Sequence, residues 1–342
     1  MLRKIYRAVV PGFIRRGIRK VRNIPSLFRE FREEYTARSI TYSYYALMLD
    51  WMMCSMFLGA SPNDYFKYRF YEKSRRFRRQ FVTLGRSRFL IRSFNDGSED
   101  QRKLVEDKTI FAHVFADMTK RKILSSEDLA YEAFTSFLAS LGRVIIKPAD
   151  GYNGNGIYIL RASDGEEAIR QAYGSFSQHK YTIEEVLEQD GILRELNPGT
   201  VNTMRVNVIN NNGQFEIQNA VLRTGQGNKP VDNLSSGGLV SKIDVETGII
   251  ISLFCDVIGQ RLLRHPLTGT IMIGQKIPLW DKVRETAIEG ARRISKVRYT
   301  SWDIAVIKGG DVAVVEGNTY GNFQNQQIVD QTGVWEQYKK YL

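Results

Sequence analysis

The chain has 342 residues, of which 43% are hydrophobic and 25% are charged, as in an ordinary globular protein. Its formal net charge of +12 predicts attraction to an anionic partner: nucleic acid, acidic lipid or an acidic substrate. The two cysteines, Cys54 and Cys255, stand far apart, which excludes a disulfide framework and a zinc site of the cysteine type. We therefore expect a reducing, cytosolic compartment.

Residues 1–105 are predicted to form a basic, mainly helical region. Basic residues recur between Arg3 and Arg22 and leave no clean apolar stretch for a secretory signal. The segment is either a set of ordinary helices with a solvated basic face or an amphipathic segment on an anionic membrane. Residues 42–59 are apolar over almost a transmembrane length, but Asp50 at their centre would cost roughly 2.5–3.5 kcal/mol there. A buried or surface-lying helix is expected instead.

Aromatic and basic residues alternate between residues 61 and 105, a composition that can bind single-stranded nucleic acid. Four phenylalanines recur at nearly helical spacing, however, and this pattern favours the core-facing stripe of a helix. They are Phe66, Phe70, Phe77 and Phe81. No nucleic-acid partner is therefore expected.

From about residue 106 the sequence predicts a mixture of helices and short strands. Helices are expected over residues 101–115 and 281–296. Short β-branched runs separated by Gly and Asn turns predict strands. These runs are residues 144–146, 157–160, 206–209, 249–253, 304–307 and 312–315.

A glycine-rich loop follows the predicted strand that ends on Lys147, and a second strand follows the loop. In a Walker loop or a dinucleotide fingerprint the glycines open a helix, so this loop is of another kind. It would fold over a ligand as a flap that offers backbone N–H groups to phosphate oxygens, or it is only a turn. Its residues are Gly151, Tyr152, Asn153, Gly154, Asn155 and Gly156.

A Gly-Gly pair at 309–310 predicts a two-residue hairpin turn, which would pair Lys308 with Asp311. Counting outward from that turn pairs Asp303 with Glu316. A wider loop would shift the register and leave the two carboxylates as separate surface residues.

Directly opposed side chains have Cβ atoms only about 4.5–5.5 Å apart, so Asp303 and Glu316 would destabilise the sheet without a cation between them. Asn318 follows Glu316 by two residues and would share its face. Two carboxylates and an amide oxygen predict a magnesium site.

In this order, the elements resemble the ATP-grasp superfamily. The resemblance rests on Lys108, on Lys147 before the flap, on the segment 183–187, on Asp303 and on the Glu316-x-Asn318 pair. The middle of the chain is similar to ligases that add glutamate to ribosomal proteins and amino-acid carriers. Together with the run from His265 to Gly269, the whole resembles the sugar-transfer-associated ATP-grasp group found among cell-surface polysaccharide genes. It covers about residues 104–330.

The resemblance implies an α+β class with the ATP-grasp fold, in which two α+β subdomains clasp ATP behind the helical N-terminal region. The predicted domains are 1–105 and 106–342. The second is divided into a glycine-flap subdomain, about 106–182, and a metal and acceptor subdomain, 183–342. The N-terminal region lacks a recognisable α/β pre-domain, and the segment after Asn318 departs from the family pattern, so substrate contacts are not carried over.

The resemblance also implies roles for individual residues. Arginines suit a developing acyl phosphate because their planar fork matches its oxygens. Arg205 as a structural ion-pair partner and His265 as a turn residue remain alternatives. The implied roles are ATP phosphates for Lys108, Lys147 and the flap; the adenine pocket for Glu184, Glu185, Val186 and Leu187; Mg²⁺ for Asp303, Glu316 and Asn318; the acyl phosphate for Arg205 and Arg223; and the acceptor side for Asn233.

The expected activity is an ATP- and Mg²⁺-dependent ligase that joins a carboxylate to an amine or a hydroxyl through an acyl phosphate. Its substrate would be a small molecule or a polysaccharide precursor. The alternatives are a kinase of the same fold and a non-catalytic nucleotide-binding scaffold at the membrane. We expect a cytoplasmic protein whose basic N-terminus contacts the inner membrane face peripherally.

Overall fold

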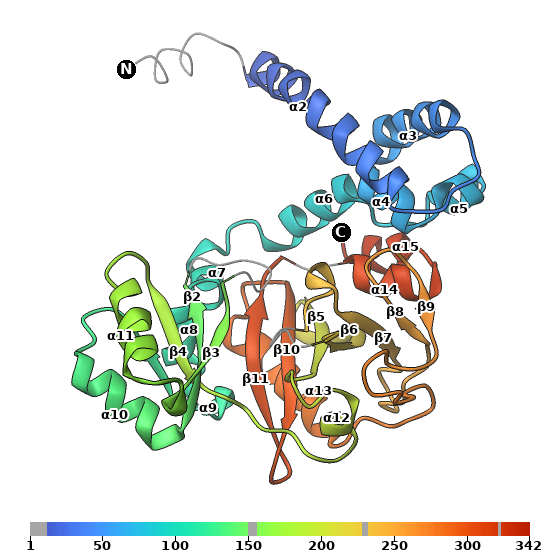
Figure 1. Cartoon of the computed structure of the whole chain (residues 1–342). Coiled ribbons are helices and arrows are strands. Elements are labelled where there is room, and N and C mark those ends of the chain that lie inside the picture. The colour runs from blue at the N-terminus through green and yellow to red at the C-terminus, as the bar shows by residue number, and fades with distance from the viewer. Residues whose placement is uncertain (1–11, 150–155, 228–231, 321–322) are drawn as a thin grey trace, which may run out of the picture.

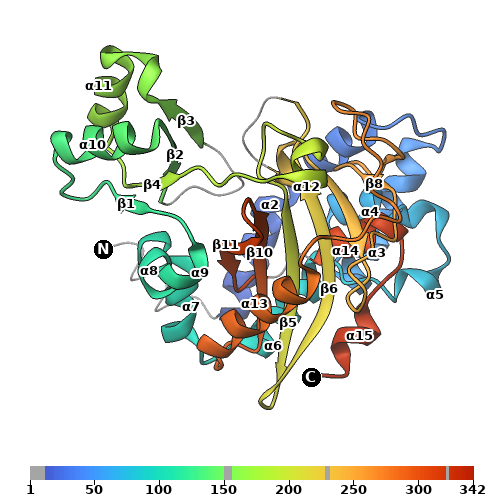
Figure 2. The same ribbon diagram turned by 90° about the horizontal axis from the view of Figure 1, so that it is seen from below.

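A computed structural model describes residues 12–149, 156–227, 232–320 and 323–342, with the side chains of residues 12–23 left aside. The chain is arranged as an N-terminal helical region, a small lobe built on a four-stranded sheet and a large lobe built on a seven-stranded sheet (Figure 1). Figure 2 shows the two sheets side by side, joined by the segment between β4 and α12. The predicted α+β class, with a helical N-terminal region, is confirmed.

The N-terminal helices enclose an aromatic core of their own. Phe31 and Tyr65 are fully buried there, and Trp51 is 3% exposed. Of the four phenylalanines predicted to share one helix, three are buried, but Phe77 is 39% exposed and several short elements carry them. The prediction that these phenylalanines line one helix was wrong, because the chain turns between one phenylalanine and the next. The elements are α2 (Gly12–Thr36), α3 (Tyr44–Leu58), α4 (Pro62–Lys67), η1 (Phe70–Glu72) and α5 (Arg75–Arg78).

The apolar segment predicted as a buried or surface-lying helix is α3, and that prediction is confirmed. Its inner face buries Leu47, Trp51 and Cys54. Asp50 lies beside this face, where its carboxylate accepts from Arg78 Nη1 and Tyr65 OH, both at 2.7 Å. No helix in the described part of the chain is both long and apolar enough to cross a membrane.

Glutamines of α14 (Phe323–Asp330) join the N-terminal helices to the large lobe. The buried Gln327 donates to Tyr68 OH at 2.9 Å and to the carbonyl of Val82 at 3.0 Å. Just beyond α14, Gln331 donates to the carbonyl of Lys67 at 2.9 Å. This junction therefore holds by directed hydrogen bonds. Helices α6 (Leu84–Asn95) and α15 (Trp335–Lys339) lie beside it.

The small lobe is an antiparallel sheet in the order β1-β4-β2-β3, packed against two helices. Val144, Ile146 and Ile183 point from the sheet toward Phe134 and Leu138 of α10, and all five are buried. The elements are β1 (Ile123–Ser125), α10 (Tyr131–Leu141), β2 (Arg143–Pro148), β3 (Tyr158–Arg161), η2 (Ala162–Asp164), α11 (Glu166–Ser175) and β4 (Tyr181–Glu185).

The large lobe is an antiparallel sheet in the order β11-β10-β5-β6-β7-β8-β9. Helix α13 covers one face, where Trp280, Val283 and Trp302 share the main core. The strand predicted over 249–253 is absent from this described segment, which makes only isolated bridges. The elements are α12 (Gly191–Leu196), β5 (Thr203–Asn211), β6 (Gln214–Thr224), η3 (Leu234–Ser236), β7 (Leu239–Ile243), β8 (Phe254–Cys255), β9 (Arg261–Leu262), α13 (Trp280–Arg293), β10 (Tyr299–Ile307) and β11 (Asp311–Asn318).

The helix predicted over 101–115 is broken into α7 (Glu99–Glu106) and α8 (Lys108–Val114), with α9 (Ala116–Thr119) after them. Asp107 causes the break, because its carboxylate caps α8 by accepting from the N–H groups of Thr109 and Ile110 at 2.9 and 3.1 Å. The cap places Lys108 at the first position of α8. These helices contribute Val105, Phe111 and Phe115 to the large-lobe core.

Candidate functional site

Two clusters of charged side chains lie where the small and large lobes meet. The first is centred on Glu184 of β4, which is 5% exposed, and is called the glutamate cluster. The Glu184 carboxylate accepts from Lys147 Nζ at 2.7 Å, from Arg121 Nε at 2.8 Å and from Thr182 Oγ1 at 3.0 Å. Burial alone would raise the pKa of Glu184, but the two cations outweigh it and lower that pKa to about 2. Glu184 is therefore ionised at neutral pH.

Arg121 of the glutamate cluster also reaches the large lobe. Its guanidinium donates to the carbonyls of Val314 at 2.8 Å and Val315 at 3.0 Å, both in β11. The side chain is 3% exposed, so one buried arginine fastens β4 of the small sheet to β11 of the large sheet. Sequence reasoning missed Arg121, because it stands in the run Lys120-Arg121-Lys122 with nothing to distinguish it from a surface cation.

The two predicted phosphate-binding lysines meet at the end of β2. Lys108 Nζ donates to the carbonyl of Pro148 at 2.6 Å, one residue beyond Lys147. The predicted flap residues Gly151, Tyr152, Asn153, Gly154 and Asn155 lie outside the described residues. Gly156, the last of the flap, has φ +75°, and a Cβ there would stand 2.9 Å from the Pro148 ring. Lys108, Lys147 and Gly156 therefore all lie beside Pro148 at the end of β2.

The predicted adenine-pocket residues form the end of β4 and the start of the connection to the large lobe. Glu185 is the last residue of β4, and its carboxylate accepts from the backbone N–H of Lys122 at 3.1 Å. Val186 and Leu187 follow and are half-buried. Their backbone is continuous with the strand that carries Glu184.

Gln189 anchors this connection to the large lobe and was not predicted. Its amide donates to the carbonyls of Val306 at 2.8 Å and Asn202 at 3.1 Å, and its oxygen accepts from the Asn202 N–H at 2.7 Å. The side chain is 6% exposed, so the crossing point between the lobes is fixed beside β10.

The second cluster is centred on Asp303 of β10 and is called the aspartate cluster. Arg205 lies directly opposite on β5 and binds both carboxylate oxygens, through Nε at 2.7 Å and Nη2 at 2.6 Å. Arg223 of β6 adds a bond from Nη1 at 2.5 Å. Burial would raise the pKa of Asp303, but the two guanidinium groups hold it well below its usual range. Arg205 therefore forms the structural ion pair that was one of its two predicted roles.

Arg223 also ties the aspartate cluster to the loop that precedes β7. Its Nη2 donates to Asp232 at 2.6 Å and to Asn233 Oδ1, and Asp232 accepts in turn from the Thr203 hydroxyl. The loop closes tightly because Gly238 lies under it, where a Cβ would stand 2.5 Å from the Asp232 carbonyl. Asn233 therefore lies beside the arginines, as the predicted acceptor-side loop requires, and Asp232 is an addition to the predicted set.

The hairpin that carries the predicted metal ligands is wider at its tip than expected. Ile307 pairs with Asp311, so the loop is the three residues Lys308–Gly310 and not the Gly-Gly pair alone. The predicted pairing of Lys308 with Asp311 was wrong. A three-residue loop should have shifted the register of the whole hairpin.

A bulge in β11 restores that register. Ile304 pairs with Val314 while Asp303 pairs with Glu316, so Val315 is the extra residue. The predicted pairing of Asp303 with Glu316 is confirmed, although the turn from which it was counted was not the right one. Arg205, Asp303 and Glu316 stand in one row across β5, β10 and β11.

Glu316 is exposed and has no ion-pair partner among the described residues. Desolvation of its carboxylate by the surrounding protein atoms, and then the facing Asp303 carboxylate, raise the pKa of Glu316. The cations Arg205, Arg223 and Lys147 act in the opposite direction. Lys147 belongs to the small lobe and the arginines to the large lobe. Glu316 is therefore the point at which the charges of both clusters converge.

Asn318 pairs with Ser301 across the hairpin, two residues beyond Glu316. Its Nδ2 and the Ser301 hydroxyl are both buried without a hydrogen-bond partner. Between the two ligand positions lies Gly317, where a Cβ would stand 2.7 Å from Val105 and 2.9 Å from the Trp302 ring. The ligand strand can thus lie close against α7 only because this residue is glycine.

The residues fit a divalent cation in chemistry. Two facing carboxylates and a raised pKa at Glu316 describe a place where added positive charge is favourable, and the amide oxygen of Asn318 would be the third oxygen ligand. Asp303 already binds two guanidinium groups, so a cation would share it with them. In the described part of the chain no group of three or more His, Cys, Asp and Glu side chains forms a metal site, so the site would need the amide.

His265 lies outside both clusters. It is 1% exposed and its ring binds the carbonyl of Gly225 at 2.8 Å, while its backbone N–H bonds to Thr270. Burial lowers the pKa of the His265 imidazole. These contacts support the alternative that His265 is a turn residue.

A protein-family model described as sugar-transfer associated ATP-grasp matches residues 85–341. This match confirms the predicted resemblance. The sequence matches none of the curated proteins at a significant level.

Several solved structures are similar in fold. The ATP-grasp ligase PsnB, complexed with precursor peptide PsnA2 and AMPPNP, shares 15% identity over 72% of this chain and 61% of its own, with a TM-score of 0.45. D-cycloserine synthetase DcsG shares 12% identity over 70% and 71%, with a TM-score of 0.45. D-alanyl-alanine synthetase A from Vibrio cholerae O1 shares 10% over 70% and 60%, with a TM-score of 0.43. The chain thus spans about three fifths of the length of PsnB.

Proposed function

Because the chain belongs to the sugar-transfer-associated ATP-grasp family, we propose that it is an ATP- and Mg²⁺-dependent ligase that joins a carboxylate to an amine or a hydroxyl. The proposed route is an acyl phosphate, with ADP and phosphate as the released products. Such chemistry depends on positioning phosphate and neutralising its charge, and it needs no protein nucleophile. Cys54 and Cys255 are both buried, in keeping with that requirement.

The observation that carries the proposal is the convergence of charge on Glu316. The charges of Lys147 in the small lobe and of Arg205 and Arg223 in the large lobe all lower the pKa of the Glu316 carboxylate. A carboxylate with a raised pKa beside a second carboxylate favours a metal ion, and the surrounding cations favour anionic oxygens bound to that metal. These charges support a metal ion with bound phosphate oxygens at Glu316.

In this proposal each cluster has a separate task. Lys108 and Lys147 hold the ATP phosphates, and the segment Glu184–Leu187 lines the adenine site. Asp303, Glu316 and Asn318 hold Mg²⁺, which neutralises phosphate charge when bound. Arg205 and Arg223 face the developing acyl phosphate, and their fixed forks suit a planar anion. The bond from Arg223 to Asn233 connects that site to the acceptor-side loop.

The deciding experiment measures ATP turnover with Mg²⁺ against sugar acids, amino acids and polysaccharide precursors, with ADP and product mass both recorded. A product equal to two substrates less one water, formed with ADP, is the expected result. Hydroxylamine should trap the acyl phosphate as a hydroxamate. The Glu316→Gln variant should lose turnover, and full turnover in that variant would refute the assignment. Asp311→Asn, in the same hairpin, is the matched control.

A kinase of the same fold is the second candidate, because the same lysines and metal ligands would position a γ-phosphoryl group for a hydroxyl acceptor. It differs in its product, which would be one substrate heavier by a phosphate and inert to hydroxylamine. Nucleotide binding without turnover on any mixture would instead support the scaffold alternative. The polysaccharide-precursor substrate is part of the proposal and rests on the sugar-transfer association of the family.

We also propose that the basic N-terminal region makes peripheral contact with an anionic membrane. Residues 1–11 and the side chains of residues 12–23 lie outside the described part of the chain, and the support comes from α3. The outer face of this helix exposes Tyr45, Leu49, Met56 and Phe57, of which Met56 is 73% and Phe57 71% exposed. Met52 and Met53 extend the same face. A continuous apolar helix face of this kind suits burial in the headgroup region of a bilayer.

The charge beside α3 favours anionic lipid as its partner. Helix α5 lies against α3, since Arg78 bonds to Asp50 and Cys54. Arg75 and Arg76 of α5 are exposed there. Each basic residue near an anionic leaflet adds about 1 kcal/mol to binding.

Vesicle sedimentation tests this contact. The full chain should bind phosphatidylglycerol vesicles and leave phosphatidylcholine vesicles unbound, and Phe57→Asp should abolish binding. Leu263→Asp is the matched control, because Leu263 is a half-exposed apolar residue in the large lobe, remote in sequence from α3. Equal binding by the Phe57→Asp variant, or no binding by the wild type, would refute the membrane contact.

A further inference from the structure

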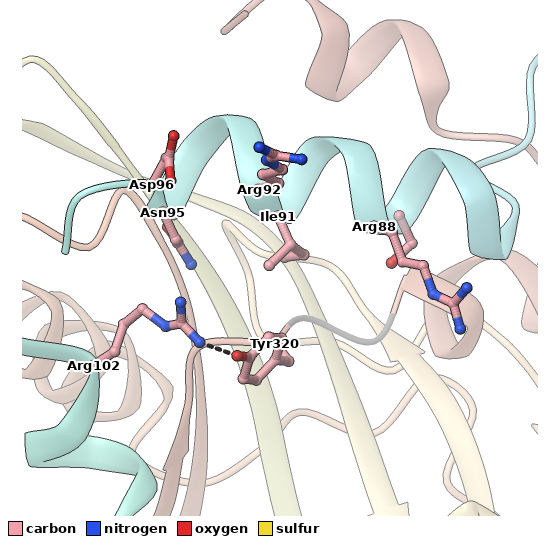
Figure 3. Close-up of a pocket in the computed structure, with 8 residues that line it drawn as sticks. Arg88, Ile91, Arg92, Asn95, Asp96, Arg102 and Tyr320 are labelled. Carbon is pink, nitrogen blue, oxygen red and sulfur yellow. Dashed lines mark hydrogen bonds between the residues drawn. The ribbon is translucent and has the colours of Figure 1, made fainter. Parts of the chain in front are cut away.

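A small pocket lies where α6 faces the residues that follow β11 (Figure 3). Its volume is about 250 Å³. Arg88, Ile91 and Asn95 line it from one face of α6, and Arg102 and Tyr320 line it from the opposite side. None of these residues takes part in the two charged clusters, so the pocket is a separate feature.

The wall of the pocket is fixed to the strands that carry the proposed metal ligands. The amide of Asn95 donates to the carbonyls of Tyr299 at 3.0 Å and Thr319 at 2.9 Å, and its oxygen accepts from the Tyr299 N–H at 2.9 Å. Asn95 is 1% exposed, and these three hydrogen bonds of its side chain are all to backbone groups. Helix α6 is thereby held against the start of β10 and the end of β11. The pocket wall is therefore fixed by hydrogen bonds to the large lobe.

The charged groups of the pocket lie on both sides of Tyr320. Arg88 is exposed and has no ion-pair partner among the described residues. Arg102 is positioned by Glu106 at 3.1 Å, and its guanidinium lies 4.8 Å from the centre of the Tyr320 ring and donates to the Tyr320 hydroxyl. In Figure 3 the side chains of Arg92 and Asp96 project from α6 away from Tyr320. Arg92 and Asp96 also line the pocket, so three arginines stand against one aspartate there and positive charge is in excess beside the Tyr320 ring.

We propose that this pocket binds an anionic group, a phosphate or a carboxylate, on a sugar-sized part of the second substrate. Arg88 and Arg102 would contact the anion, and Tyr320 and Ile91 would contact the ring. The volume is slightly below that of pockets for drug-sized ligands, about 300–1,000 Å³, and so suits one sugar ring. Tyr320 follows Asn318 by two residues, at most about 7 Å along the backbone, so one substrate can span both sites. This inference rests on the proposed function and specifies its substrate class.

Isothermal titration of the full chain with glucose 6-phosphate, glucuronate and glucose tests the pocket without nucleotide or Mg²⁺. At least one of the two anionic sugars should bind, and neutral glucose should not. Arg88→Gln should weaken that binding at least tenfold, and Lys103→Gln, which removes an exposed cation beside Arg102, should leave it unchanged. Circular dichroism shows that each variant is folded.

Three outcomes would overturn the proposal. They are no binding of either anionic sugar by the wild type, equal binding in the Arg88→Gln variant, and binding of phosphatidylglycerol vesicles through Arg88 in place of the soluble sugars. Because these titrations need neither ATP nor turnover, they can fail while the ligase assignment stands. Conversely, intact turnover in Glu316→Gln would refute the catalytic assignment and leave the sugar-binding result untouched.

Discussion

The glutamate cluster and the aspartate cluster are both built from a buried carboxylate and two cations, and comparing them shows what a second carboxylate adds. Glu184 and Asp303 are both buried, each is bound by two cations, and each has a lowered pKa. The partners of Glu184 across the sheet are apolar, Ile123 and Ile145, whereas Asp303 faces Glu316. A second carboxylate in the opposite position is what leaves negative charge unneutralised. The facing carboxylate thus adds to the desolvation that raises the pKa of Glu316, and in the proposed function this is the position where Mg²⁺ binds.

Asp303→Asn should have the largest effect. It leaves Arg205 and Arg223 without their shared carboxylate, and breaking a buried ion pair typically costs about 3–5 kcal/mol. We expect that loss in the free energy of unfolding and complete loss of ATP turnover, measured by urea denaturation with tryptophan fluorescence and by ADP release. Asp311→Asn removes a half-exposed carboxylate paired with Lys120 and Lys282, and it should cost about 1 kcal/mol or less. Similar losses in the two variants would contradict the comparison.

Glu184→Gln should follow. The pKa of Glu184 lies at about 2 in the folded chain against 4.5 in the unfolded one, so its charge stabilises the fold by roughly 3 kcal/mol. A depressed pKa gives stability that is present above about pH 4.5 and is lost as the pH falls toward about 2. The difference between variant and wild type in urea should therefore be large at neutral pH and shrink in acid. A difference independent of pH would show that packing, and not charge, is lost.

Arg121→Lys should have a smaller effect. Lysine keeps a positive charge near Glu184 but cannot also reach the carbonyls of Val314 and Val315, and such bonds contribute about 1–2 kcal/mol. The urea midpoint should fall by a corresponding amount, and the Michaelis constant for ATP should rise because the lobes are less firmly joined. Lys120→Arg is the control at a neighbouring exposed position. An unchanged Michaelis constant would confine Arg121 to stability.

Glu316→Gln should have the smallest effect on stability, and of the opposite sign. A carboxylate with a raised pKa costs stability once the pH exceeds that pKa, so the variant should be more stable than the wild type by about 1 kcal/mol or less at neutral pH in EDTA. The advantage should disappear below the unfolded pKa of 4.5. Added Mg²⁺ should raise the unfolding temperature of the wild type alone. A variant that is destabilised in EDTA would show that Glu316 is a structural residue.

The facing carboxylates of the aspartate cluster could be predicted from the sequence, because residues in a hairpin pair in a regular order that can be counted from the turn. Counting from the Gly-Gly pair found the facing of Asp303 and Glu316, but only because a wider loop and the bulge at Val315 offset each other. Neither event has a clear signature in a single sequence. A hairpin with either one alone would have turned the two carboxylates to opposite faces.

The residues that were missed are those whose roles depend on tertiary contact. Arg121 and Gln189 connect the two lobes, and their partners are mostly backbone carbonyls, which every sequence contains. The break at Asp107 was predictable in principle, since Asp before a helix is a strong cap. The apolar periodicity on both sides of it concealed the boundary, because α7 and α8 face the same core.

The glutamine junction beneath the N-terminal helices has a consequence for cooperativity. The aromatic core around Phe31 and Trp51 and the core of the large lobe are separate clusters. A third apolar cluster joins α6 to the large lobe, but α14 contacts the helices before α6 through amide hydrogen bonds. Directed polar contacts transmit little of the free energy that makes two apolar cores melt together. Calorimetry of the full chain should therefore resolve more than one transition, with an enthalpy from van't Hoff analysis below the calorimetric one.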